Sequence, residues 1–204
     1  ISKITPLELK QFSDQFLVAQ NMNIAITGQL NSKEALKLSE RIANHLKQGK
    51  KAKPLTDPID KSSFDIRHMA FNSSQAHVIM GHLGTIRFDS DRLALEVANQ
   101  MFGGIGFNSV LMKELRVKRG YTYGAYSSFS FSQAPGTFSL SYSTKQDQLL
   151  DSIQVAHRAL VDFVKQPIDQ KQLEETKAGM LRAFPNNYSS NANINAQLGS
   201  MGFY

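Results

Sequence analysis

An arginine and a tyrosine seven residues apart, Arg116 and Tyr123, are the side chains of this sequence that best fit chemistry on a peptide. A guanidinium carries several N–H donors in a fixed fork, which suits the oxygens of a carboxylate or a carbonyl group. A tyrosine hydroxyl can donate to a peptide carbonyl, or to the oxyanion that forms when that carbonyl is attacked. Taken by themselves, the two residues are also explained as a helix-terminal cation and a strand aromatic.

A glycine-rich loop leads into the helix that is expected to carry the arginine. Gly103, Gly104 and Gly106 permit a tight turn, because glycine tolerates positive φ and a close approach of backbones. Asn108 or Ser109 can then cap the helix with a side-chain oxygen. Its apolar residues are Val110, Leu111, Met112 and Leu115, and its basic end is Arg116, Lys118 and Arg119. A phosphate-binding loop is not predicted, because the Gly-Lys-Ser/Thr ending is missing and the loop follows a helix rather than a strand.

A strand is expected directly after Gly120, which is a natural end for the helix. From Tyr121 on, aromatic and apolar residues alternate with small polar ones, which is typical of a strand with two unlike faces. Strand parity places Tyr123 on the side of Phe129 and Phe131. Aiming its hydroxyl at a cavity therefore requires a bulge or a position at the mouth of the sheet.

Periodicity and capping residues predict the other elements. A Pro-Gly turn joins the strand from Tyr121 to a second strand, which gives a hairpin; the second strand contains Phe138, Leu140 and Tyr142. Other strands are expected over residues 22–27, 64–70 and 75–83, the last of them apolar on both faces and therefore central. Helices are expected after Thr5, with Glu8 completing a capping box, after Asn31 or Ser32, around residues 93–101, and over 146–165 and 169–184. Together these elements predict an α+β fold with a mainly antiparallel sheet and helices packed on one face.

The stretch FGGIGFNSVLMKELRVKRGYTYGAYSSF resembles the second, non-catalytic domain of the insulinase/pitrilysin-type zinc metallopeptidases, or inverzincins. Members show a GG-x-G loop, a helix ending in Leu-Arg, then Lys-Arg-Gly, and a tyrosine seven residues after the arginine. The resemblance implies that Arg116 and Tyr123 face a zinc centre carried by another domain and hold the substrate peptide there. In processing-peptidase relatives the glycine loop is linked to substrate handling, which makes Gly103, Gly104 and Gly106 candidate substrate-binding residues.

Zinc itself is not expected in this chain. The catalytic domain of the family binds zinc through H-x-x-E-H, where both histidines are ligands and the glutamate activates water. None of the histidines here has that spacing; they are His45, His68, His77, His82 and His157. We therefore predict no metal ligand and no cofactor in this segment, which should be inactive alone. The resemblance implies that a partner domain or subunit supplies H-x-x-E-H and zinc.

Length, composition and charge limit the domain number and the classes of function that fit this sequence. A length of 204 residues with 41% hydrophobic content fits one domain over residues 1–204. The net charge of +6 can attract polyanions, but no nucleic-acid motif accompanies it, so nucleic-acid binding is not predicted. The absence of cysteine excludes disulfides, and no apolar run reaches membrane-spanning length. Because the sequence starts at Ile1 without methionine, we expect a segment of a longer chain. Bacterial members of the family suggest the cell envelope or periplasm.

Three functions remain to be compared. The first is a non-catalytic domain or subunit that binds and orients a substrate peptide opposite a partner's zinc centre. The second is a purely structural subunit, like the family's core subunits in a respiratory complex. The third is a basic polyanion-binding module, which rests on charge alone. Retention of both Arg116 and Tyr123 favours the first.

Overall fold

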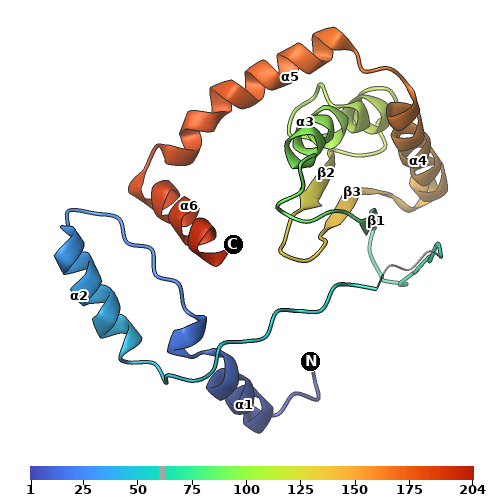
Figure 1. Cartoon of the computed structure of the whole chain (residues 1–204). Coiled ribbons are helices and arrows are strands. Elements are labelled where there is room, and N and C mark those ends of the chain that lie inside the picture. The colour runs from blue at the N-terminus through green and yellow to red at the C-terminus, as the bar shows by residue number, and fades with distance from the viewer. Residues whose placement is uncertain (60–62) are drawn as a thin grey trace. The chain divides into compact units, whose positions relative to one another are not determined.

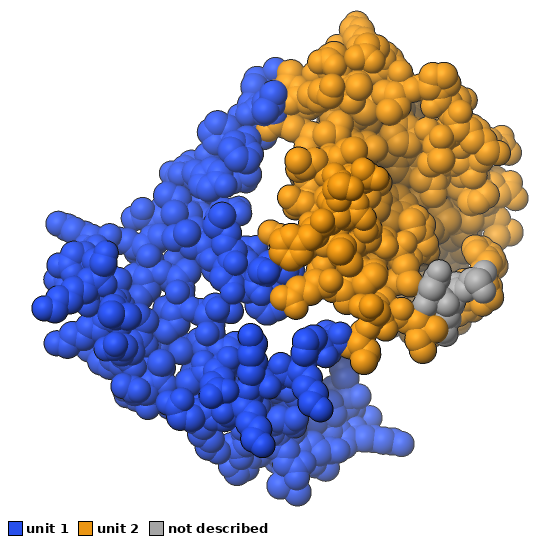
Figure 2. Space-filling model, in the orientation of Figure 1, with its two compact units in different colours: residues 1–55, 181–204 blue, residues 56–180 orange. Residues whose placement is uncertain are grey.

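The computed structural model describes residues 1–59 and 63–204 (Figure 1). The chain forms two compact units, of which the first comprises residues 1–55 and 181–204 and the second residues 56–180 (Figure 2). All candidate site residues lie in the second unit. The expectation of a single domain over the whole chain stays a prediction.

The second unit is built on a three-stranded antiparallel sheet. Its strands are β1 (Gln75–Leu83), β2 (Ala125–Ser130) and β3 (Thr137–Lys145), in the order β1-β3-β2. β2 and β3 form the predicted hairpin, in which Phe129 pairs with Phe138. The hairpin prediction is therefore confirmed, although β2 begins four residues later than the change of sequence period suggested.

Helices cover one face of this sheet (Figure 1). The covering elements are α3 (Arg92–Gly103), the π-helical turn η2 (Met112–Val117) and α4 (Leu149–Lys165), which follows the short η3 (Gln146–Gln148). Alternate residues of β3 point into the core between the layers; they are Phe138, Leu140 and Tyr142. The helical side of the same core includes Phe102, Leu111, Leu115, Ala156 and Ala159. This layering confirms the predicted α+β fold.

The first unit is mainly helical, and α5 (Gln170–Ala183) connects the second unit to it along the chain. The elements of the first unit are α1 (Pro6–Phe16), η1 (Ala19–Asn21), α2 (Ser32–Ala43), η4 (Phe184–Tyr188) and α6 (Asn191–Phe203). Thr5 and Glu8 form the predicted capping box at the start of α1. Within the described residues of this unit, Val18 is the only hydrophobic side chain that is buried. Among the helices that the structure describes, none combines the length and the apolar character needed to cross a membrane.

Residues 22–27 and 64–70 are not strands, and this corrects two predictions. Their apolar residues alternate as expected, but a strand also needs a neighbour whose backbone groups pair with its own. Within the described parts of the chain, neither segment pairs with another strand. The first segment instead lies beside α6, where the Thr27 hydroxyl donates to the backbone carbonyl of Asn191 at 3.1 Å.

β1 is an edge strand, which corrects the prediction of a central position. Of the strands that the structure describes, β3 is the only one that pairs with it. Val78 points into the core, whereas Ile79 on the opposite face is 77% exposed. One face of β1 is therefore packed against the core, and the apolar Ile79 on its other face is exposed.

We predict that Phe138→Ala destabilises the second unit by roughly 3–5 kcal/mol, because it leaves a cavity among packed rings. Phe138 is 5% exposed, and its ring centroid lies 5.0 Å from that of Phe129 and 6.4 Å from that of Phe102. Chemical denaturation of the purified chain measures the change. Phe88→Ala removes an exposed ring and is the control. Equal denaturation midpoints for the two variants would contradict the buried position of Phe138.

Candidate functional site

The glycine loop begins at a close contact between α3 and β2. A Cβ atom on Gly103 would lie 2.3 Å from the hydroxyl oxygen of Ser127 and 2.6 Å from its backbone nitrogen. Asn99, one turn earlier in α3, donates from its side-chain amide to the Ser127 carbonyl at 3.1 Å and accepts from the Ser127 hydroxyl at 2.7 Å. Gly103 is therefore required where helix and strand touch, and it is buried there.

The other two loop glycines differ in their surroundings. Gly104 is buried, and a Cβ atom there would meet the side chain of Gln100. Gly106 is exposed and has φ +130°, a conformation that side-chain-bearing residues rarely adopt. The residues on either side of Gly106 are both exposed, Ile105 to 89% and Phe107 to 61%. The loop thus presents two large apolar side chains at the surface.

Arg116 lies in a π-helical turn rather than in the regular helix that the sequence suggested. The wider turn is closed by a hydrogen bond from the Lys118 N–H to the Lys113 carbonyl at 3.0 Å. Gly120, with φ +64°, then ends the turn, and its N–H donates to the Arg116 carbonyl at 2.9 Å. Single π-helical turns are frequent at functional sites. The fully buried Leu115 anchors this one in the core.

Two chain segments hold the guanidinium of Arg116. Its Nη1 donates to the backbone carbonyl of Tyr123 at 2.6 Å. Its Cζ lies 4.6 Å from the centroid of the Phe107 ring, which is within the range of a cation–π contact. In the parts of the chain that the structure describes, no carboxylate forms an ion pair with this arginine. Arg116 therefore keeps its positive charge and several N–H donors for a ligand.

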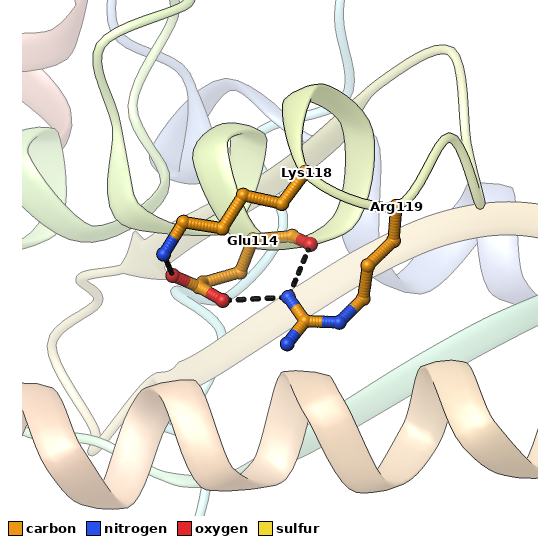
Figure 3. Close-up of polar contacts among 3 residues, drawn as sticks. All are labelled: Glu114, Lys118 and Arg119. Atoms are coloured by element: carbon orange, nitrogen blue, oxygen red, sulfur yellow. Dashed lines mark hydrogen bonds and ion pairs between the residues drawn. The ribbon is translucent and has the colours of Figure 1, made fainter.

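The other two cations of the basic run share one carboxylate partner, that of Glu114 (Figure 3). Lys118 Nζ contacts its Oε1, and Arg119 Nη1 contacts its Oε2 at 2.7 Å. The hydrogen bond from Lys118, helped by the one from Arg119, lowers the pKa of Glu114 below its usual range. The pairing distinguishes Arg116 from its two basic neighbours.

Tyr123 precedes β2, so the parity of that strand does not govern its side chain. The Thr122 hydroxyl donates to the Gly124 carbonyl at 2.9 Å and accepts from the Gly124 N–H at 3.2 Å, which folds the backbone around Tyr123. The tyrosine is 84% exposed. Its hydroxyl has no hydrogen-bond partner among the described residues. The structure thus brings Arg116 to the backbone of Tyr123 and leaves the phenol without a partner among the described residues. Of the two arrangements that strand parity allowed, a bulge or a position at the end of the sheet, Tyr123 has the second, two residues before β2.

Phe107 contacts a predicted site residue, Arg116, but was not itself predicted from the sequence. It stands inside the glycine loop as an aromatic residue among small ones, nine positions before Arg116. That placement was the only sequence signal for it. A cavity of about 310 Å³ elsewhere in the second unit includes Glu114 and Arg119, but neither Arg116 nor Tyr123 lines it. The candidate site is therefore an exposed surface and not this cavity.

The histidines do not form a metal site. His77 and His82 lie on β1, where their ring nitrogens contact the Ser143 hydroxyl at 2.8 Å and the Leu83 carbonyl at 2.6 Å. His45 lies just after α2, and its Nδ1 contacts the backbone carbonyl of Arg41 at 2.6 Å. Among residues 1–59 and 63–204, no three histidine or carboxylate side chains come together as metal ligands would. The described residues therefore do not fit a zinc centre.

Comparison with known proteins gives a consistent set of relatives. The family described as the peptidase M16 inactive domain matches residues 3–180. The crystal structure of a peptidase M16 inactive domain from Pseudomonas fluorescens is 33% identical, with a TM-score of 0.89, over 100% of this chain and 48% of that chain.

Two curated relatives are more distant in sequence. The non-peptidase homolog YmxG of Helicobacter pylori is 26% identical over 186 residues, which cover 91% of this chain and 43% of the relative. An uncharacterized zinc protease of Rickettsia bellii is 28% identical over 170 residues, which cover 81% of this chain and 38% of the relative. The chain thus spans less than half the length of each of these three relatives.

We predict that Glu114→Gln removes a pH-dependent part of the stability. Because the folded-state pKa of Glu114 is lowered, its carboxylate stabilises the fold above the pKa of the unfolded chain. That contribution is lost as the pH falls through the lower folded-state value. At neutral pH the variant should be less stable by at most about 1 kcal/mol, since the pair is partly exposed.

Denaturation of wild type and variant at a series of pH values, from about 7 down to about 3, measures this difference. It should shrink to zero at the acid end. Glu175→Gln, at an exposed glutamate that forms no ion pair within the described residues, is the control. A stability difference that stays constant with pH would show that the charge of Glu114 does not stabilise the turn.

Proposed function

The chain belongs to the peptidase M16 inactive-domain family, and from this membership we propose that it is the substrate-holding, non-catalytic part of a zinc metallopeptidase. The family match confirms the resemblance to insulinase/pitrilysin-type peptidases on which the sequence prediction was based. The proposal adds a role for named residues. Arg116 binds an oxygen of the substrate peptide, and Tyr123 donates to the carbonyl group that is cleaved.

The observation that carries this proposal is the unpaired charge of Arg116. A carboxylate partner would compensate the charge of the guanidinium and engage up to two of its five N–H donors. Here the partners are a neutral carbonyl and an aromatic ring, while Glu114 pairs with Lys118 and Arg119. A peptide carboxylate or carbonyl can therefore meet donors that are not already satisfied.

The phenol of Tyr123 supplies the second contact. Because it is exposed and its hydroxyl is not bonded to a described residue, it can donate to a substrate oxygen without breaking a bond within the protein. A donor aimed at the developing oxyanion acts mainly on the transition state. The arginine thus orients the peptide, and the tyrosine contributes to the reaction step.

The zinc centre belongs to a partner in this proposal. A domain or subunit with H-x-x-E-H would hold the metal, which polarises a water molecule for attack on the peptide. Two findings support a separate zinc-binding domain or subunit. The chain belongs to a family of inactive domains, and it spans less than half the length of the Pseudomonas fluorescens and Helicobacter pylori relatives. The zinc-binding part would lie in the same polypeptide or in another subunit.

A structural, non-peptidase role is the second candidate. One observation favours it, which is that the Helicobacter pylori relative carries the name non-peptidase homolog. Such a protein would need the fold but not the free arginine and tyrosine. The two candidates therefore predict different outcomes for substitutions at Arg116 and Tyr123.

We predict that the purified chain holds no stoichiometric zinc and cleaves no peptide by itself. The reason is that no three histidine or carboxylate side chains come together among the described residues, and that His45, His77 and His82 contact other groups. Elemental analysis after gel filtration gives the zinc content, and an internally quenched peptide library tests cleavage. One tightly bound zinc per chain, lost together with peptidase activity on chelation, would refute the assignment of zinc to a partner.

We also predict that Tyr123→Phe and Arg116→Lys lower peptide cleavage by the assembled enzyme. Loss of one donor to an oxyanion reduces turnover by about 10²–10³ in other hydrolases, so we expect a clear fall for Tyr123→Phe. The lysine variant keeps the charge but loses the fork, so it should bind substrate less well. Cleavage assays run beside thermal denaturation separate activity from stability.

Matched controls are available in the same unit. Tyr126→Phe removes the hydroxyl of another exposed tyrosine, and Arg158→Lys changes an exposed arginine of α4. Both should cleave at the wild-type rate. Wild-type rates in the Tyr123 and Arg116 variants as well would reject the substrate-holding role in favour of the structural one.

A further inference from the structure

We infer that Phe107 is a positioning residue, which holds the guanidinium of Arg116 in the orientation that binds substrate. The restraint of Arg116 by Phe107 is inferred from contacts within this chain, whereas the effect of Phe107 on peptide cleavage rests on the proposed function. No sequence motif assigns a role to this ring. The glycine loop would then act on the substrate through Phe107 and Arg116, rather than through its own backbone.

The first observation is that the ring and the backbone restrain the guanidinium from two sides. The Phe107 centroid lies 4.6 Å from Cζ of Arg116, and the Tyr123 carbonyl accepts from Nη1 at 2.6 Å. The ring comes from the loop before the π-helical turn, and the carbonyl comes from the segment after it. Arg116 is therefore ordered before any ligand arrives.

The second observation is that the loop carrying this ring is itself fixed. At its start, Gly103 lies in contact with Ser127 of β2. At its end, Ser109 is buried and its hydroxyl donates to the Gly106 carbonyl at 3.5 Å. Phe107 lies between these points and is not part of the hydrophobic core. It is 61% exposed, and among the described residues it forms no aromatic ring pair, whereas it does contact Arg116.

The N–H donors of Arg116 also determine how a ligand can approach. All of them lie in the plane of the guanidinium, whose Cζ lies over the Phe107 ring, so the side of the guanidinium that meets the ring is closed to a ligand. One edge already meets the Tyr123 carbonyl. A carboxylate or peptide carbonyl must therefore come in the guanidinium plane, which favours planar oxygen ligands. A flexible arginine would have to be ordered on binding, and this cost weakens affinity.

The test begins with the geometry in the full chain. In protein with labelled arginine, the side-chain protons of Arg116 should show an upfield ring-current shift. Phe107→Leu should abolish this shift, whereas Phe107→Tyr should keep it. Ile105→Ala, which removes an exposed apolar side chain from the same loop, should leave it unchanged. A shift that persists in Phe107→Leu would overturn the inference, whatever the activity.

The second arm uses the assembled peptidase and an internally quenched peptide library. Phe107→Leu should lower kcat/KM by about two- to fivefold, the size of an exposed cation–π contact. Phe107→Tyr should restore the wild-type value. In an Arg116→Met background, Phe107→Leu should have no further effect, because it acts through the arginine. Additive losses would show that Phe107 has another role, and would overturn the inference.

The two arms also separate this inference from the proposed function. If the ring-current shift depends on Phe107 but Arg116→Met cleaves at the wild-type rate, the substrate-holding role of Arg116 is wrong, and the effect of Phe107 on cleavage is rejected with it. If Arg116→Met loses activity but the shift is independent of Phe107, the proposed function stands and only the positioning role is rejected.

Discussion

The close contact between the end of α3 and β2 is the constraint on which the candidate site depends. Gly103 lets the two backbones approach, and Asn99 fastens the contact through two hydrogen bonds to Ser127. The glycine loop starts there, and the segment with Tyr123 runs into the same strand. Loop and tyrosine therefore take their positions from one sheet, and Arg116 lies between them. A side chain at position 103 would displace the whole arrangement, since packed interiors do not yield easily.

Charge is distributed unevenly within the basic run that follows the loop. Glu114 pairs with both Lys118 and Arg119, so part of the charge of these two residues is compensated within the turn. Arg116 is left with a carbonyl and a ring, which order it without cancelling its charge. The overall charge of +6 is therefore a poor guide to binding. What decides the chemistry of each cation is whether a carboxylate lies next to it.

Sequence reasoning succeeded where structure follows from local chemistry. The capping box at Thr5 and the β2–β3 hairpin are encoded by residues close together in the chain, and both were predictable. Residues 22–27 and 64–70 have the alternation of strands, but pairing depends on a neighbour that local sequence does not specify. At the site, Arg116 and Tyr123 were predicted as a pair. The role of Phe107 was not, because a ring-to-cation contact exists only after the loop has folded.

Because Arg116 lies in a π-helical turn, the number of residues in that turn matters as much as their types. Such a turn is in effect an α-helix with one extra residue inserted, so deleting one residue between Met112 and Val117 should restore a regular helix. A deletion before Arg116 would rotate the arginine by about 100° around the axis and away from the Phe107 ring. The buried Leu115 next to it would turn as well, so the contact of the arginine and the packing of the core depend on the same number of residues. The register of this turn therefore fixes the position of Arg116 as strictly as the core fixes that of Leu115.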